Sequence, residues 1–243
     1  MLEPQSLTLA DIATWMRQGV AIQRRLAVPS ALYAGALAWL AVLMFLAAWL
    51  AGAVPMVYAL VSGFLLVGSI ASSGLMLLAL MLERGEPLSL KAMLRRWSAI
   101  PGLFALLGFS LFLWLIWVTD AGILYGLYFR QAELPFMPMF GFSEPLAAFL
   151  LFSGLMGAVP AIIMLAVATF AVPLVLEARC SLPRAVGLSV RALRINLLVL
   201  FFWAACVALL VALALCLLPL FLWLFPVLCF ASFVCYRQVF PLA

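Results

Sequence analysis

The sequence predicts an all-α polytopic membrane protein with about six transmembrane helices, arranged as three hairpins that each follow a basic amphipathic interfacial helix. Three observations predict this single membrane domain over residues 1–243. Of these residues, 70% are hydrophobic and only 9% are charged, whereas a soluble domain has roughly a quarter charged residues. The apolar residues form runs of the length that crosses a bilayer, about 20 residues each. A short basic segment precedes each pair of runs, so one unit is used three times.

The first unit begins with an amphipathic helix predicted over residues 6–27. Trp15 and Met16 belong to its apolar face. The basic residues of its other face are Arg17, Arg24 and Arg25. A basic amphipathic helix of this kind lies flat in the membrane interface, with docking onto a partner protein as the alternative. Hairpin one follows over residues 30–82.

The second unit repeats this order with an interfacial helix over residues 87–98. Its basic residues are Lys91, Arg95 and Arg96. Hairpin two covers residues 99–176 and contains an aromatic outer flap over residues 121–144. Asp120 comes just before the flap, and a rise of about 1.5 Å per residue from Ala99 puts it roughly 30 Å away, at the outer interface. We expect Asp120 either to be solvated there or to bind an ion or a partner.

The third unit has its interfacial helix over residues 181–196 and hairpin three over residues 197–237. Its basic residues are Arg184, Arg191 and Arg194. Glu83 and Glu177 each follow a leucine at the end of a second span, at corresponding positions of two units. We expect them to be interfacial acids that tie helix ends to the basic helices by ion pairs, with a proton-coupled role as the alternative.

Lysine and arginine gather on one side of the predicted topology. Of the 13 basic residues, Arg130 alone falls opposite the side that holds both chain ends. Cytoplasmic segments carry an excess of lysine and arginine. The sequence therefore predicts a multi-pass protein with both termini in the cytoplasm. The three basic segments are expected to form one basic collar at the cytoplasmic surface.

Motifs for catalysis or cofactor binding do not stand out. The chain has no histidine, which excludes a histidine-ligated haem or zinc site and a histidine general base within it. It also lacks the glycine-rich phosphate loop, the zinc-protease helix and the hydrolase elbow. The sequence therefore predicts neither an enzyme nor a cofactor. Nucleic acid is not expected as a partner, because the basic residues alternate with membrane-facing leucine and tryptophan.

Several short motifs resemble one family of bacterial membrane proteins. They lie in residues 63–68, 83–87, 172–177 and 226–237, in this order along the chain. From about Trp15 to Arg237, the sequence is similar to the family called domain of unknown function 2189. The resemblance implies a multi-spanning protein of the bacterial inner membrane without an assigned activity. The closing motif of the family commonly has histidines, whereas this chain has none. A metal or haem role that depends on those histidines is therefore not expected here.

Two functions from different classes fit these observations. The first is a non-catalytic accessory, scaffold or assembly subunit, which packs against membrane lipids and other integral membrane proteins through the small residues of its second span. The second is a transporter or channel for a small neutral or amphiphilic solute, which needs a polar path through the bundle. The hydroxyl residues that would have to converge on this path are Ser62, Ser69, Ser72, Ser73, Ser110, Ser153 and Thr169.

Overall fold

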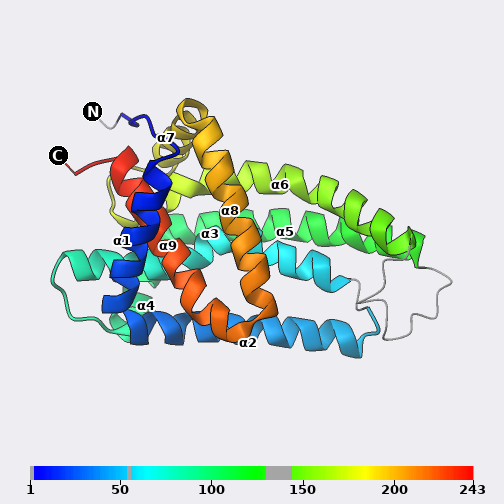
Figure 1. The fold of residues 1–243 in the computed structure, drawn as a ribbon. Helices are drawn as coiled ribbons and strands as arrows, with labels where there is room; N and C mark the ends of the chain where they lie inside the picture. The colour runs from blue at the N-terminus through cyan, green and yellow to red at the C-terminus, as the bar shows by residue number, and fades with distance from the viewer. Residues whose placement is uncertain (1–2, 54–55, 130–143, 243) are drawn as a thin grey trace.

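The computed structural model describes residues 3–53, 56–129 and 144–242, and these residues form nine α-helices and no strand (Figure 1). Helices make up 86% of the structure, so the all-α prediction is confirmed. Six helices are long and apolar enough to cross a membrane: α2 (Ala27–Leu50), α3 (Met56–Glu83), α5 (Pro101–Tyr128), α6 (Glu144–Leu176), α8 (Leu197–Cys216) and α9 (Leu218–Val239). Three short helices precede the pairs: α1 (Asp11–Arg25), α4 (Leu90–Ser98) and α7 (Leu182–Ile195).

Several predicted boundaries are wrong. The first interfacial helix begins at Asp11 rather than at residue 6, because Thr8 donates through its N–H and its hydroxyl to the Asp11 carboxylate in a turn before the helix. The first span begins at Ala27 rather than at residue 30, since the residues after Arg25 are apolar.

The outer flap does not begin at residue 121, because α5 continues to Tyr128. Apolar residues continue the helix here, and Tyr125 packs edge-to-face on Phe149 of α6 at 6.4 Å between ring centroids. Residues 130–143 of the predicted flap lie outside the described residues. The second interfacial helix begins at Leu90 rather than at residue 87, because Ser89 caps it by accepting a hydrogen bond from a backbone N–H of the first turn.

The three short helices connect the units in a ring. We define a unit as one short helix with the two spans that follow it: α1–α2–α3, α4–α5–α6 and α7–α8–α9. Helix α4 packs on α3, and α7 packs on α6, so each lies against the second span of the preceding unit. Helix α1 packs on α9, the last span of the chain. The first unit thus closes onto the third, and each short helix joins two units.

The contact between α1 and α9 is close. The Trp15 indole is fully buried and donates a hydrogen bond of 2.7 Å to Gln238 at the end of α9. One turn further along α1, a Cβ on Gly19 would lie 2.7 Å from the backbone oxygen of Val227. Only glycine lets the two backbones approach this closely. The apolar face of α1 therefore packs against the bundle.

Helices α4 and α7 attach to their neighbours through serine hydroxyls. Trp97 of α4 donates to the hydroxyl of Ser73 on α3 over 2.6 Å. Ser189 of α7 donates to the Ala166 carbonyl (2.8 Å) and accepts from the Phe170 N–H (3.2 Å). These two backbone groups of α6 would bond to each other in a regular helix. Each short helix is thus held to the bundle by polar as well as apolar contacts.

Both termini lie at the same end of the molecule, beside α7 and the end of α9 (Figure 1). The Gln5 N–H donates to the Val239 carbonyl over 3.0 Å. The buried amide of Asn196, between α7 and α8, accepts from the Leu7 N–H at 2.7 Å and donates to the Gln5 carbonyl at 3.0 Å. The segment before α1 therefore ties the third unit to the first.

Candidate functional site

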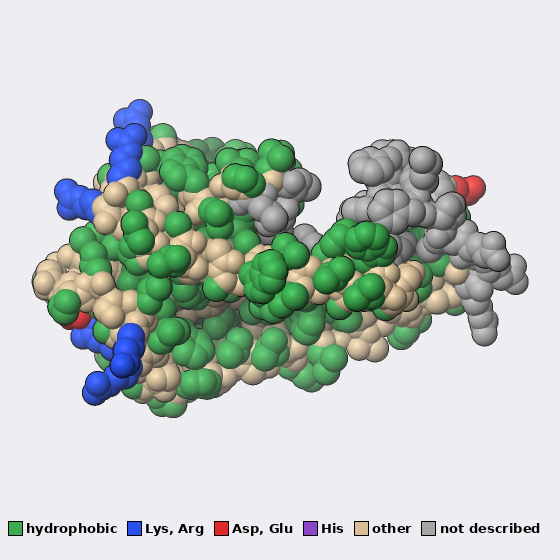
Figure 2. All heavy atoms as spheres, turned by 90° about the horizontal axis from the view of Figure 1, so that it is seen from below, with side chains coloured by type: hydrophobic (Ala, Val, Ile, Leu, Met, Phe, Trp, Pro, Cys, Tyr) green, Lys and Arg blue, Asp and Glu red, His purple; other side chains and the backbone are tan. Residues whose placement is uncertain are grey.

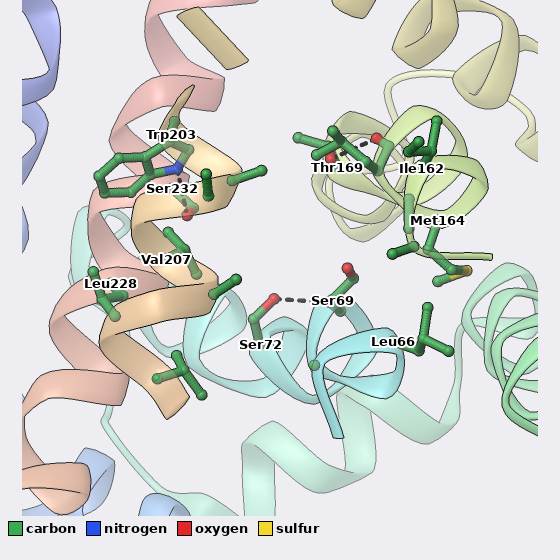
Figure 3. Close-up of a pocket in the computed structure, with 18 of the residues that line it drawn as sticks. Leu66, Ser69, Ser72, Ile162, Met164, Thr169, Trp203, Val207, Leu228 and Ser232 are labelled. Carbon is green, nitrogen blue, oxygen red and sulfur yellow. Dashed lines mark hydrogen bonds between the residues drawn. The ribbon is translucent and has the colours of Figure 1, made fainter. Parts of the chain in front are cut away.

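A cavity of about 630 Å³ lies between α3, α6, α8 and α9 (Figure 3). This volume falls within the range of roughly 300–1,000 Å³ that is common for ligand pockets. Its walls are mainly apolar and include Met164, Val207 and Leu228. Among the lining residues that the structure describes, none carries a charge. The cavity is therefore suited to a neutral, largely apolar molecule.

The cavity occupies one of three seams between neighbouring units. Helix α2 packs on α9 of the preceding unit, and α5 packs on α3 of the preceding unit. The corresponding partner of α8 would be α6, but in the described residues α8 packs mainly on α9 and makes few contacts with α6. The seam between α6 and α8 is thus open, whereas the other two are closed.

Small residues provide the space within this open seam. The α8 wall presents Ala204 and Ala208 to the cavity, and the α6 wall presents Ala161 and Ala168. Nearby, the Trp117 ring packs so closely on Gly157 of α6 that a Cβ there would lie 2.5 Å from it. At these positions the short side chains of both walls contribute to the void, because neither helix fills the distance between them there.

Four of the seven hydroxyl residues named from the sequence line this one cavity: Ser69, Ser72, Ser153 and Thr169. Three of them donate hydrogen bonds to carbonyls of their own helices. Ser72 donates over 2.7 Å, Ser153 over 3.4 Å and Thr169 over 2.6 Å. A hydroxyl that donates to its own helix keeps its lone pairs free to accept. The walls therefore offer acceptors to a bound molecule at a few separate points.

The other named hydroxyl residues do not line the cavity. Ser73 accepts the Trp97 hydrogen bond on α4. Ser110 of α5 donates to the Leu66 carbonyl of α3 over 3.0 Å. The side chain of Ser62 lies outside the described part of the chain. A continuous path through all seven residues is therefore not formed, although a shared pocket for four of them is.

Sequence reasoning missed two polar groups of the site. Trp203 of α8 donates to the hydroxyl of Ser232 on α9 over 3.2 Å, and both residues line the cavity (Figure 3). Ser232 is a polar residue within the apolar run of the last span. Its position in an apolar run could have marked Ser232 as a candidate. The hydrogen bond with Trp203 could not be predicted, because it depends on how α8 and α9 pack.

The cavity opens toward the apolar outside of the bundle. Two of its lining residues, Ile162 on α6 and Phe201 on α8, are 53% and 57% exposed. Their neighbours on the outer faces of the same helices, Val159 and Phe202 among them, are exposed as well. Since both helices are membrane spans by length and composition, the mouth of the cavity faces the hydrocarbon of the bilayer.

A second polar feature joins the ends of α3, α6 and α9. The guanidinium of Arg237 forms ion pairs with Glu83 and with Glu177, the latter at 2.7 Å. Tyr236 donates a hydrogen bond to the Glu177 carboxylate, whose side chain is only 4% exposed. Arg179 donates to the Phe240 carbonyl over 2.7 Å. We call Glu83, Glu177, Arg179, Tyr236 and Arg237 the helix-end cluster.

The helix-end cluster differs from the predicted ion pairs in two respects. The two acids pair with Arg237 on α9 and not with the basic short helices, because the ends of the three second spans converge. The two acids also do not occupy corresponding positions at the ends of their helices. The left-handed residue that ends each helix is Gly85 (φ 63°) after α3 and Ala178 (φ 54°) after α6. Glu83 therefore precedes this residue by two positions and Glu177 by one.

All nine side chains of the predicted basic collar are exposed: Arg17, Arg24, Arg25, Lys91, Arg95, Arg96, Arg184, Arg191 and Arg194. Figure 2 shows that the lysine and arginine side chains visible from that side gather at one end of the molecule. This is the end that holds the short helices in Figure 1. Within this group, Arg96 pairs with Glu86, and Arg191 lies 4.0 Å from Glu3.

Asp120 does not belong to the cavity. It lies within α5, eight residues before the end of that helix, and is partly exposed.

Burial raises the pKa of the Cys180 thiol between α6 and α7, against an opposing effect of Arg184 and Arg179. In the part of the chain that the structure describes, no three histidine, cysteine, aspartate or glutamate residues lie close enough together to hold a metal ion.

The six apolar spans and the exposed apolar surface around them define a multi-pass integral membrane protein. Residues 56–177, half of the chain, match the family described as predicted integral membrane protein (DUF2189). The chain belongs to this family, which confirms the resemblance for the three motifs inside the matched residues. The closing motif over residues 226–237 lies outside them. The matched part runs from the start of α3 to Glu177 of the helix-end cluster. Neither a comparison with curated proteins nor one with solved structures found a match.

Proposed function

We propose that this membrane protein binds a neutral or amphiphilic molecule in the cavity between α3, α6, α8 and α9, as a carrier or transporter of that molecule. The observation that carries the proposal is that four hydroxyl residues from two helices line one apolar cavity, at separate points of its walls. Apolar walls with a few placed polar groups are the usual composition of a small-molecule site. The proposal includes no catalytic step.

Photolabelling with a neutral amphiphile tests this proposal. The probe is octanol that carries a diazirine, applied to the full-length protein in detergent, with labelled peptides identified by mass spectrometry. We expect saturable labels on cavity residues such as Val207 and Leu228, and we expect unlabelled octanol to compete. A Gly68→Phe variant should lose these labels, because Gly68 lines the cavity and a Cβ there meets nothing within 4 Å.

The matched control is Gly108→Phe. Gly108 is an exposed glycine of α5 that does not line the cavity, and a Cβ there also meets nothing within 4 Å. This variant should keep the labels inside the cavity. Equal labelling of the two variants, or labelling that octanol cannot compete, would show that the cavity is not a binding site.

A second candidate function is that of an accessory, scaffold or assembly subunit, and one residue favours it. Trp39 is 65% exposed on α2, 12 residues after the start of that helix at Ala27, which is roughly 18 Å along its axis. Tryptophan is enriched at the two interfaces of a membrane and not at mid-depth. An exposed tryptophan here suits packing against another membrane protein. Crosslinking in intact membranes from position 39 should then give one reproducible partner, whereas crosslinks to lipid alone would reject this role.

The orientation that we propose is a bacterial inner membrane with both termini in the cytoplasm. Its support is that the exposed basic side chains and the two termini share one end of the molecule. The variants Arg95→Cys and Arg191→Cys should react with a membrane-impermeant maleimide only from the cytoplasmic side. Labelling from the periplasmic side would overturn the proposed orientation.

A further inference from the structure

We infer that the occupant of the cavity is an acyl chain of a membrane lipid, which enters sideways from the bilayer through the open seam between α6 and α8. This inference rests on the proposed function and names the ligand of the same site. Four features of the described residues carry it: the direction of the mouth, the length of the cavity, the state of its hydroxyl groups and the comparison with the two closed seams.

The direction of the mouth selects a ligand that comes from the bilayer. Ile162 and Phe201 line the opposite rims of the seam, and both are more than half exposed on the apolar outside of the bundle. A water-soluble solute would have to cross hydrocarbon to reach this mouth. A lipid chain is already there, so it enters without a change of solvent.

The length of the cavity fits a chain rather than a compact molecule. Along α6 its lining residues run from Leu150 to Val172. Val172 lies 22 positions after Leu150, which is roughly 33 Å at about 1.5 Å per residue. A cavity of about 630 Å³ that extends over such a length is long and narrow and runs along a membrane span.

Three hydroxyl groups of the site and its indole N–H do not oppose an aliphatic chain. Ser72, Ser153 and Thr169 each donate to a carbonyl of their own helix. The indole N–H of Trp203 is bound by Ser232. An acyl chain therefore leaves none of these donors without an acceptor, so the penalty for burying an unpaired donor does not arise. A solute rich in hydrogen-bonding groups would find no charged partner among the described lining residues.

The two closed seams show what the open one lacks. Between α3 and α5, Ser110 donates to the Leu66 carbonyl, and between α9 and α2, the Leu222 side chain would lie 3.8 Å from a Cβ on Gly35. Protein side chains fill both of these seams. If the space in the third seam stayed empty, the side chains that line it would lack dispersion contacts on that side. In the seam between α6 and α8, an acyl chain supplies those contacts.

The test uses a photoreactive lipid in a bilayer. Full-length protein is placed in phosphatidylcholine vesicles with a trace of phosphatidylcholine that carries a diazirine near the end of one acyl chain. We expect labels inside the cavity at Val207 and Leu228 as well as on the outer face at Leu155. Gly68→Phe should lower the inner labels about tenfold, a change of about 1.4 kcal/mol in binding, and leave the outer label unchanged. Gly108→Phe should change neither.

The outcomes separate this inference from the proposed function. If the diazirine octanol labels the cavity and the lipid does not, the acyl-chain inference is overturned and the cavity remains a site for another amphiphile. If neither probe labels it, both proposals fail. If Gly68→Phe does not fold, Gly154→Phe takes its place, because Gly154 also lines the cavity with open space at its Cβ. Inner labels that persist in the folded filled variant would likewise overturn the inference.

Discussion

Replacing Arg237 with glutamine should destabilise the protein far more than removing an exposed arginine does. Arg237 is 17% exposed and is the closest cation to the Glu177 carboxylate, which is only 4% exposed. Its loss leaves that carboxylate with the Tyr236 hydroxyl and with Arg179 at 3.9 Å. Removing one partner of a buried ion pair costs about 3–5 kcal/mol. We expect about 3 kcal/mol, the lower end, because these two neighbours remain.

The matched control is Arg96→Gln. Arg96 pairs with Glu86, but its side chain is 43% exposed, and exposed ion pairs contribute only about 0–1 kcal/mol. For a chain of this size about 3 kcal/mol corresponds to a fall of roughly 6–12 °C in apparent Tm, so Arg237→Gln should show such a fall. Arg96→Gln should fall by at most a few degrees. Tryptophan fluorescence during heating in mild detergent measures both.

A double variant tests the cause of this loss. If the cost comes from an unpaired buried carboxylate, Arg237→Gln combined with Glu177→Gln should recover part of the lost Tm, because the charge is removed with its partner. Equal shifts for Arg237→Gln and Arg96→Gln, or a double variant less stable than either single variant, would refute the reasoning.

Three further predictions concern the backbone and the first short helix. Ala178→Gly should raise the free energy of unfolding and Gly85→Ala should lower it, by about 1 kcal/mol each. The reason is that both residues have a left-handed backbone conformation, which glycine adopts more easily than alanine. A change of the same sign in both variants would contradict this. Gly19→Ala should lower Tm through a loss of about 1–3 kcal/mol, because a Cβ there meets backbone atoms of α9. The Thr8 backbone N–H and further hydrogen bonds hold the pKa of Asp11 below its usual range. The amides at the start of α1 should therefore keep their protection factors, relative to the intrinsic exchange rate at each pH, from neutral pH downward and lose them only as the pH falls through that pKa.

The helices themselves could be predicted from the sequence because each depends on neighbouring residues. The apolar runs predicted six spans, and hairpin two ends at residue 176 as predicted. The short helices follow from their basic amphipathic pattern. The end of α5 could not be predicted in this way, because it is set by tertiary packing of Tyr125 on Phe149. Here a contact between two helices continues a helix that the local pattern ends earlier.

The candidate site could be predicted only in part. The sequence named Ser69, Ser72, Ser153 and Thr169, since hydroxyl residues in apolar spans are easily found. It could not show that α8 stays away from α6, which is what opens the cavity around them. The partner of Glu177 was also out of reach. Arg237 lies 60 residues further along the chain, and no local pattern connects the two residues.

The packing of α1 on α9 has a consequence for biosynthesis. Helix α1 ends at Arg25, and its partner is complete only at Val239, so nearly the whole chain is translated between the two. At about 5–20 residues per second this takes roughly 10–40 s. During that time the buried face around Trp15 has no partner within the protein, and only the membrane surface can cover it. A ribosome that stops before the last span therefore leaves a recognisable exposed helix, which quality-control proteases could use to tell an unfinished chain from a finished one.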